Sequence, residues 1–444
     1  MSKKLRIIGG GFAGSEAAWQ AGNRGIMVQL FEMRPVKSTP AHQTDNLAEL
    51  VCSNSLRSNA LENASGLLKE EMRRLDSLIV KTADETRVPA GIALAVDRDL
   101  FSKKVTEKIE NHPSIEIIRE EIVSLEDEHP TIIATGPLTS PALSAEIARL
   151  TQGKYLYFYD AISPILHADS IDMSTAFLGS RYGKGMDDGD EGDYINIGLD
   201  ESEYEKFHND LLEGEKVPLR DFEKAIFFEG CLPLEEMALR GKETLAYGPM
   251  KPVGIEHPET GETYHAVVQL RREDLTGDFF SMVGFQTRLR YPEQKRVFRN
   301  LPGLKHAKFL RYGSLHRNTF INSPRLVRNT LQIKRYSNIF VAGQLTGVEG
   351  YLESAATGLL SGIYASAKLE GDLILEAPPT TSLGALTQYI TTSKQKSFQP
   401  MNINFGLFPP FERRVTKRDR RKRVGERALR DLDSWLEKQK IPAE

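Results

Sequence analysis

The sequence predicts an α/β protein in which a doubly wound, Rossmann-like nucleotide-binding domain is interrupted by an inserted α+β domain. Three observations lead to this fold. A glycine-rich turn connects an apolar strand to a helix within residues 5–19, apolar strands that end in glycine follow at 131–136 and 338–343, and residues 170–310 alternate short strands with helices. Strand–helix–strand units predict a parallel sheet, and the change of pattern between them predicts a second domain.

Length and composition are those of a globular protein. The chain has 444 residues, enough for two or three domains, with a net charge of −3 and 40% hydrophobic residues. Its apolar runs are shorter than the roughly 18 residues that span a bilayer, and glycines interrupt the first of them, so we expect a cytoplasmic protein with no membrane contact. Two cysteines, Cys52 and Cys231, exclude a disulfide framework and a four-cysteine zinc site, and we expect no metal.

The N-terminal motif predicts a dinucleotide site. A strand at 5–8 precedes the glycine turn, a helix follows it, and a second strand at 27–31 ends in an acid 18 residues after the last glycine, close to the expected spacing of about 20. Glycines let the backbone approach a pyrophosphate at the helix N-terminus, and the acid binds a ribose hydroxyl. The predicted contacts are Gly9, Gly10, Gly11, Phe12, Ala13, Gly14 and Glu32.

The last apolar strand predicts the other half of a glutathione-reductase-like FAD site. It leads through a glycine turn into a helix of small residues at 352–360, and large FAD proteins direct the positive end of such a helix toward the isoalloxazine ring. Most of them carry Gly-Asp at the strand end, which leaves the ribityl contact open here, and an ordinary crossover helix would give the same pattern. The candidate contacts are Gly343, Gln344, Val348 and Gly350.

A basic cluster near the C-terminus contrasts with the near-neutral average. Four phenylalanines lie just upstream of it, at 398, 405, 408 and 411, and a second basic run lies at 288–299. Cations beside aromatic rings suit a polyanion with stackable bases, although a solvated helix face is the alternative. The cluster, a candidate RNA-binding site, consists of Arg413, Arg414, Lys417, Arg418, Arg420, Arg421, Lys422 and Arg423.

Several sequence blocks, in order, resemble one known family. The blocks are residues 9–14, 31–35, 40–45, 51–56, 88–91, 93–98, 228–233 and 343–351. Together they cover essentially the whole chain and are similar to the folate- and FAD-dependent tRNA (uracil-5-)-methyltransferases. The related flavoproteins that modify wobble uridines share the N-terminal blocks, but they are longer and carry an additional helical C-terminal domain.

The resemblance implies methylation of C5 of the T-loop uridine (uridine 54) in tRNA. The carbon donor would be 5,10-methylenetetrahydrofolate, with FAD as reductant, regenerated by NADH or NADPH. Cys231 matches the nucleophile of the family, Cys52 matches a second cysteine near the flavin that is a candidate base, and His316 matches a histidine that stacks on the pterin. This chemistry is consistent: uracil C5 becomes nucleophilic when a thiolate adds at C6, and a methylene unit needs a reductant to become methyl.

Other interpretations remain open from the residues alone. A paralogue that methylates 23S rRNA, a flavoprotein partner of the wobble-uridine type and a small-molecule flavin oxidoreductase share parts of the pattern. Each cysteine could also be an inert buried thiol. For the domains we expect a first part of the FAD-binding domain at 1–169, the insertion at 170–310, a second FAD part at 311–370, and a basic segment packed on the FAD domain at 371–444.

Overall fold

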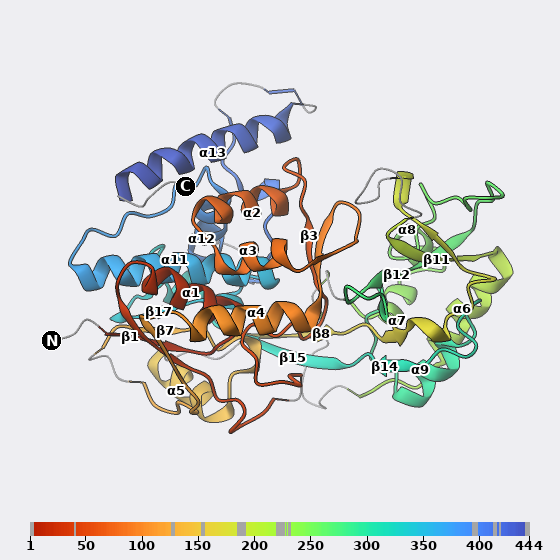
Figure 1. Cartoon of the computed structure of the whole chain (residues 1–444), viewed down its shortest axis with the longest axis horizontal. Helices are drawn as coiled ribbons and strands as arrows, with labels where there is room; N and C mark the ends of the chain where they lie inside the picture. The colour runs from red at the N-terminus through yellow and green to blue at the C-terminus, as the bar shows by residue number, and fades with distance from the viewer. Residues whose placement is uncertain are drawn as a thin grey trace.

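The chain folds around two six-stranded sheets, which lie in separate halves of the molecule (Figure 1). The computed structural model describes residues 4–39, 41–125, 129–151, 156–183, 192–218, 227, 229, 232–392, 398–411, 415–416 and 419–439. Within this part of the chain, no helix is long and apolar enough to cross a membrane.

The first sheet belongs to the nucleotide-binding domain. Five of its strands are parallel, and β16 adds an antiparallel edge. Its apolar strand residues, such as Leu5 and Ile132, are fully buried, as expected for a parallel sheet with both faces covered. The strand order is β16 (Gln332–Ile333), β17 (Tyr336–Val341), β7 (Thr131–Ile133), β1 (Lys4–Ile8), β2 (Met27–Phe31) and β6 (Ile115–Ile118).

Two helices pack closely beside this sheet, α1 (Phe12–Gly22) and α11 (Tyr351–Glu370). Glycines allow the approach: a Cβ at Gly358 would lie 2.2 Å from the Ala13 carbonyl oxygen, and one at Gly362 would lie 2.6 Å from that of Ala17. The small-residue helix that the sequence predicts therefore serves first as a packing surface for α1. Because Gly358 lies on Ala13 and Gly362 on Ala17, the two helices run in the same direction, and their N-termini lie at the same end of the sheet.

The second sheet is antiparallel and has its own core, which includes Leu166, Ile197, Tyr204 and Phe285. The helix α6 (Glu201–Glu213) covers it and begins with a capping box between Asp200 and Glu203. Further short helices are α7 (Leu234–Ala238), α8 (Thr244–Tyr247) and α9 (Tyr291–Phe298). The strand order is β10 (Phe177–Gly179), β11 (Tyr194–Leu199), β12 (Ala266–Arg272), β13 (Phe279–Met282), β9 (Ile165–His167) and β14 (Phe309–Arg311).

The boundary between the halves differs from the sequence-based one. Strands β9 and β14 pair with each other inside the second sheet, although β9 precedes residue 170. The two halves are connected by the antiparallel strands β8 (Leu156–Ala161) and β15 (Leu315–Phe320), which form a sheet of their own (Figure 1). We propose these two strands as the domain boundary.

The remaining elements surround the first sheet. The helix α13 (Arg420–Gln439) buries Val424, Leu432 and Trp435 in the same core as that sheet, and Asp433 pairs with Arg74 of α2 at 2.7 Å. The C-terminal helix therefore lies on the nucleotide-binding domain (Figure 1). The other elements are β3 (Ser55–Ser58), α2 (Ala64–Arg74), α3 (Leu78–Glu85), β4 (Arg87–Val88), β5 (Ala93–Val96), α4 (Arg98–Glu110), α5 (Pro141–Thr151), α10 (Ser323–Leu326) and α12 (Ser382–Thr392).

Candidate functional site

The glycines of the turn after β1 have two different roles: some permit close packing of the backbone, and one faces open space. Gly9 has a φ of +104°, and a Cβ there would lie 2.7 Å from the Ala134 carbonyl oxygen; one at Gly14 would lie 1.8 Å from that of Gly9. These two glycines permit close packing of the protein against itself. Gly11 is different, because a Cβ there would meet nothing within 4 Å and its backbone is in an ordinary conformation (φ −76°). Gly11 faces a pocket.

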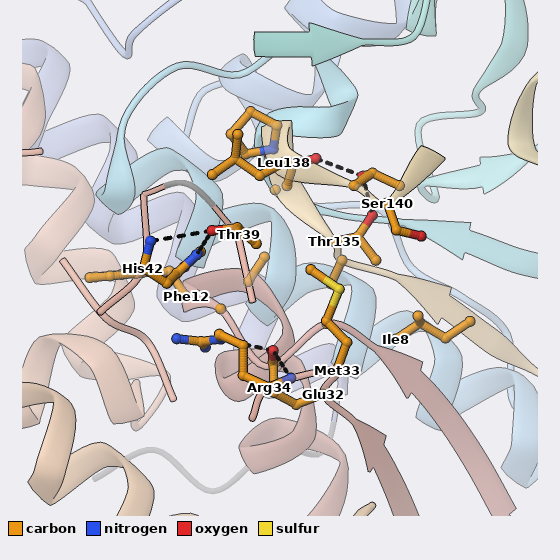
Figure 2. Close-up of a pocket in the computed structure, with 18 of the residues that line it drawn as sticks. Ile8, Phe12, Glu32, Met33, Arg34, Thr39, His42, Thr135, Leu138 and Ser140 are labelled. Carbon is orange, nitrogen blue, oxygen red and sulfur yellow. Dashed lines mark hydrogen bonds and ion pairs between the residues drawn. The ribbon is translucent and has the colours of Figure 1, made fainter. Parts of the chain in front are cut away.

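The pocket lies where β1, β2 and β7 end and α1 and α11 begin, and it has about 1010 Å³ of space, its open mouth included. Figure 2 shows Glu32 and Arg34 on one side and Thr135 and Ser140 on another. Of the predicted cofactor contacts, those that line it are Gly9, Gly11, Phe12, Ala13, Glu32, Gly343 and Gln344.

The other predicted contacts support the pocket without lining it. Gly10 donates its N–H to the Glu32 carboxylate at 2.8 Å, and Gly14 is a packing position. Val348 is fully buried, and Gly350 is the N-cap of α11 with a φ of +107°. The pattern of spacing identified the turn, but only the structure separates residues that face a ligand from those that shape the backbone.

Glu32 is fixed as a carboxylate. It accepts hydrogen bonds from the Arg34 Nε at 2.9 Å and from the N–H groups of Arg34 and Gly10. Burial acts to raise the pKa of Glu32, but the Arg34 charge and these hydrogen bonds outweigh it and hold the pKa below its usual value. An ionised, pocket-lining carboxylate at this point can accept a hydrogen bond from a ribose hydroxyl.

Two helix N-termini meet at the pocket. Neither α1, with Gly11 as its N-cap, nor α11, with Gly350, has a side-chain cap. Their first N–H groups and the positive ends of both helix dipoles are therefore available to an anionic or electron-rich ligand. Together with the glycine at 11 and the carboxylate at 32, this donor set fits a dinucleotide such as FAD.

The strand end after β17 departs from the usual Gly-Asp. Gln344 lines the pocket, but its amide nitrogen donates to the Glu349 carboxylate, and the Gly343 N–H donates to the Thr357 hydroxyl at 2.8 Å. The side chain that replaces the aspartate is thus fixed by a partner five residues further along the chain.

Cys52 lies beside the pocket, half-buried, in contact with a tyrosine that sequence reasoning did not select. Its Sγ is 2.9 Å from the Tyr351 Oη, and its N–H donates to the same oxygen at 2.7 Å. Tyr351, the first residue of α11, lines the pocket and stacks on Phe12 with ring centroids 4.5 Å apart. Its position directly after the 343–350 turn was the available sequence signal.

Tyr351 is a hydrogen-bond donor near neutral pH. Burial, followed by the negative charge that Cys52 can carry, raises the pKa of Tyr351 well above its ordinary value. Because the phenol stays protonated, its O–H can donate to the Cys52 sulfur while the oxygen accepts from the Cys52 N–H. The contact orients the sulfur at the pocket edge.

A histidine that sequence reasoning also missed lines the pocket. The Nδ1 of His42 is 2.6 Å from the Thr39 hydroxyl (Figure 2). Burial, followed by the charge of Arg34, lowers the pKa of His42 to about 4, so that the imidazole is neutral at pH 7. His42 and Arg34 both lie in blocks that carry the family resemblance, which was the signal for them.

The other predicted site residues are placed only in part. Cys231 lies outside the described residues. His316 occupies β15 opposite Asp160 of β8, and its side chain is not described. In the basic cluster, Arg413, Arg414, Lys417 and Arg418 lie outside the described residues, whereas the exposed first turn of α13 carries Arg420, Arg421, Lys422 and Arg423.

The aromatic residues upstream of the cluster do not form a stacking surface. Phe398 and Phe408 are buried, Phe405 packs against the core, and Phe411 lies under the Arg427 guanidinium at 4.3 Å. Phe398 and Phe408 are packed in the hydrophobic core, so the interpretation that these rings stack on bases is wrong for these two residues. Among the described residues of this region, the exposed cations of α13 remain candidates for RNA contact.

The second basic run is also structural. Arg290 pairs with Glu215 at 3.2 Å and Arg296 with Asp210 at 2.6 Å, while Arg288 pairs with Glu236. These charges join α9 and its flanks to neighbouring elements. The described residues contain no cluster of side chains suited to a metal ion.

Comparison with known proteins identifies the family. Residues 4–372 match the family described as glucose inhibited division protein A. The chain is 55% identical to the methylenetetrahydrofolate–tRNA-(uracil-5-)-methyltransferase TrmFO of Natranaerobius thermophilus over 435 residues, which cover 98% of this chain and 99% of that protein. It is 58% identical to the TrmFO of Geobacter sulfurreducens over 436 residues, with the same coverages. The chain belongs to the TrmFO family.

The solved structure of Aquifex aeolicus GidA has the same fold. It matches with a TM-score of 0.73 at 17% identity, over 99% of this chain and 74% of the GidA chain. The TrmFO chain is thus the shorter of the two. Both the resemblance and the α/β fold class stated from the sequence are confirmed.

Proposed function

We propose that this chain methylates C5 of the T-loop uridine of tRNA, with 5,10-methylenetetrahydrofolate as the carbon donor and FAD as the reductant. The observation that carries the proposal is the position of Cys52, whose sulfur contacts a tyrosine that lines the same pocket as the glycine turn and Glu32. A thiol at the edge of such a pocket suits a reaction that combines flavin chemistry with proton transfer. The names of relatives that are more than half identical to this chain support the same activity.

The pocket residues would hold FAD as follows. The N-terminus of α1 at Gly11 binds the pyrophosphate, Glu32 binds a ribose hydroxyl, and the N-terminus of α11 faces the ring system. Bound in reduced form, FAD supplies the reducing equivalents that convert a methylene unit into a methyl group. We propose that NADH or NADPH restores these equivalents without a domain of its own.

The two cysteines take different roles in this proposal. The Cys231 thiolate adds to C6 of the uracil, which makes C5 nucleophilic toward the one-carbon unit. Cys52, oriented by Tyr351, then accepts the C5 proton as a thiolate, and the Cys231 thiolate leaves C6 so that the C5–C6 double bond forms again. His316, in β15 between the two halves, would stack on the pterin of the folate. The reaction needs no metal.

Three substrates distinguish the alternative activities. We expect the purified chain alone, with FAD, a tRNA transcript, methylenetetrahydrofolate and NADPH, to form 5-methyluridine at the T-loop position, and to form none in a transcript with cytidine there. Formation only with a 23S rRNA fragment would favour the rRNA paralogue. No product until a second protein is added would favour a wobble-type partner protein.

The exposed cations at the start of α13 should contribute affinity for RNA. Changing Arg420, Arg421, Lys422 and Arg423 to glutamine is expected to weaken tRNA binding and to flatten its salt dependence by about three log units per log unit of salt, if all four contact phosphates. The flavin spectrum should not change. A control with Arg430→Gln and Lys438→Gln removes charge from the middle and the far end of the same helix. An unaltered salt slope in the fourfold variant would make this turn a solvated face.

A further inference from the structure

The segment that carries Cys52 is held in place from the inserted domain. We call residues 50–54 the Cys52 loop. Arg271, in β12, donates from Nε to the Asn54 Oδ1 at 2.8 Å and from Nη2 to the Ser53 Oγ at 2.9 Å. Asn54 is fully buried, and its amide donates to the Val96 carbonyl oxygen at 2.9 Å. The two residues after Cys52 are therefore fixed by side chains and backbone of both domains.

Charged groups bracket the same loop. Arg98, at the start of α4, pairs with Glu273 at 2.7 Å and donates to the Cys52 carbonyl oxygen at 3.3 Å. Glu273 in turn lies 3.9 Å from Arg271. Only 15%, 4% and 11% of the side chains of Arg98, Glu273 and Arg271 are exposed, respectively.

These buried charges are poorly explained by stability alone. Desolvation of a buried ion pair offsets most of its attraction, so such a pair contributes little net free energy of folding, while it restricts geometry. One Glu273 oxygen has no hydrogen-bond partner among the described residues. Burial of these three charged side chains costs desolvation free energy, and their contacts fix the Cys52 loop relative to the inserted domain.

We infer that Arg271 is a positioning residue for Cys52. It sets the loop so that the sulfur meets the Tyr351 hydroxyl at the pocket edge, and it couples this geometry to the docking of the inserted domain. The inference rests on the proposed function, in which Cys52 removes the C5 proton. A thiol displaced by about 1 Å from its reacting partner loses on the order of 10²-fold in rate.

The variant Arg271→Met tests the inference in the FAD-loaded protein. We expect its kcat for 5-methyluridine to fall by about 10²-fold, with unchanged KM for tRNA and for methylenetetrahydrofolate. Its FAD content and its covalent adduct with 5-fluorouridine RNA should be retained. Without RNA, alkylation of Cys52 by iodoacetamide, followed by peptide mass, should become about tenfold faster, because a charge-assisted hydrogen bond no longer holds the loop.

Two further variants provide the controls. Arg272 is the next residue of β12 and points to the opposite face, and within the described structure its side chain makes no hydrogen bond to the Cys52 loop; Arg272→Met should leave both readouts unchanged. Ser53→Ala removes one acceptor of Arg271, should lower kcat less, and should be non-additive with Arg271→Met.

Each remaining outcome is decisive. Unchanged kcat and unchanged Cys52 alkylation in Arg271→Met, with an active wild type, would overturn the positioning role. So would loss of FAD in Arg271→Met if Ser53→Ala altered neither readout, since Arg271 would then be only structural. An inactive wild type would reject the proposed function, and the alkylation experiment would still test Arg271.

Discussion

Cys231→Ala is expected to lose both methylation and covalent trapping of RNA while it keeps its FAD. A thiolate that adds to C6 leaves an enzyme–RNA adduct whenever C5 cannot be resolved, as in a T-arm hairpin that contains 5-fluorouridine. Without this nucleophile, turnover should fall by at least about 10²-fold. The measurements are the 5-methyluridine yield, the adduct on a denaturing gel and the flavin absorbance.

Cys52→Ala should separate removal of the C5 proton from the first step, the addition of a thiolate at C6. Because Cys52 contacts Tyr351 at the pocket edge, its loss should reduce methylation by about 10²-fold as a missing base, yet RNA trapping should remain. Cys52→Ser keeps a polar contact with Tyr351. Because a serine hydroxyl is a much weaker acid than a thiol, it stays protonated and cannot act as the base, so this variant should resemble the alanine variant. A peptide map that places the adduct on Cys52 would reverse the assignment, and normal rates in both alanine variants would remove cysteine from the mechanism.

Gly11→Val is expected to give folded but colourless protein. A side chain at Gly11 meets no protein atom within 4 Å and requires no unusual backbone conformation, but it projects into the pocket where a pyrophosphate would lie. Overpacking of this kind costs about 1–3 kcal/mol, so FAD affinity should fall by about 5- to 150-fold. Absorbance at the flavin bands measures the bound FAD, and circular dichroism measures whether the protein is folded.

Two other glycines serve as comparisons for this variant. Gly425→Val introduces the same side chain on α13, where a Cβ would lie 3.9 Å from the Leu67 side chain, and this variant should stay yellow. Gly14→Ala places a Cβ 1.8 Å from the Gly9 carbonyl oxygen and should disturb the fold itself. A Gly11→Val protein with full flavin would refute the position of the pyrophosphate.

The sequence predicts the first βαβ unit well because its signals are local. The turn that begins at Gly9 and the strand that ends at Glu32 need only their own neighbours, and the structure has β2 at the predicted residues. The contact between Cys52 and Tyr351 joins residues 299 positions apart. Periodicity and spacing carry no signal for such a pair, so the tyrosine was missed although its turn was identified.

The errors have the same physical origin. Phe398 resembles a stacking residue until its burial is known, and the sequence does not reveal that the basic run at 288–299 is paired with carboxylates of α6 and α7. The pattern of β9 does not reveal that it pairs with β14 across the insertion. Each of these features depends on partners that are distant in the chain.

The origin of the methyl carbon tests the central claim most directly. The purified chain, a tRNA transcript and NADPH would be incubated in parallel with carbon-labelled methylenetetrahydrofolate and with methyl-labelled S-adenosylmethionine, followed by nucleoside analysis. The proposed function predicts label in 5-methyluridine from the folate alone, and loss of this label in Gly11→Val. Label from S-adenosylmethionine, or no labelled 5-methyluridine with FAD-loaded protein, would contradict it.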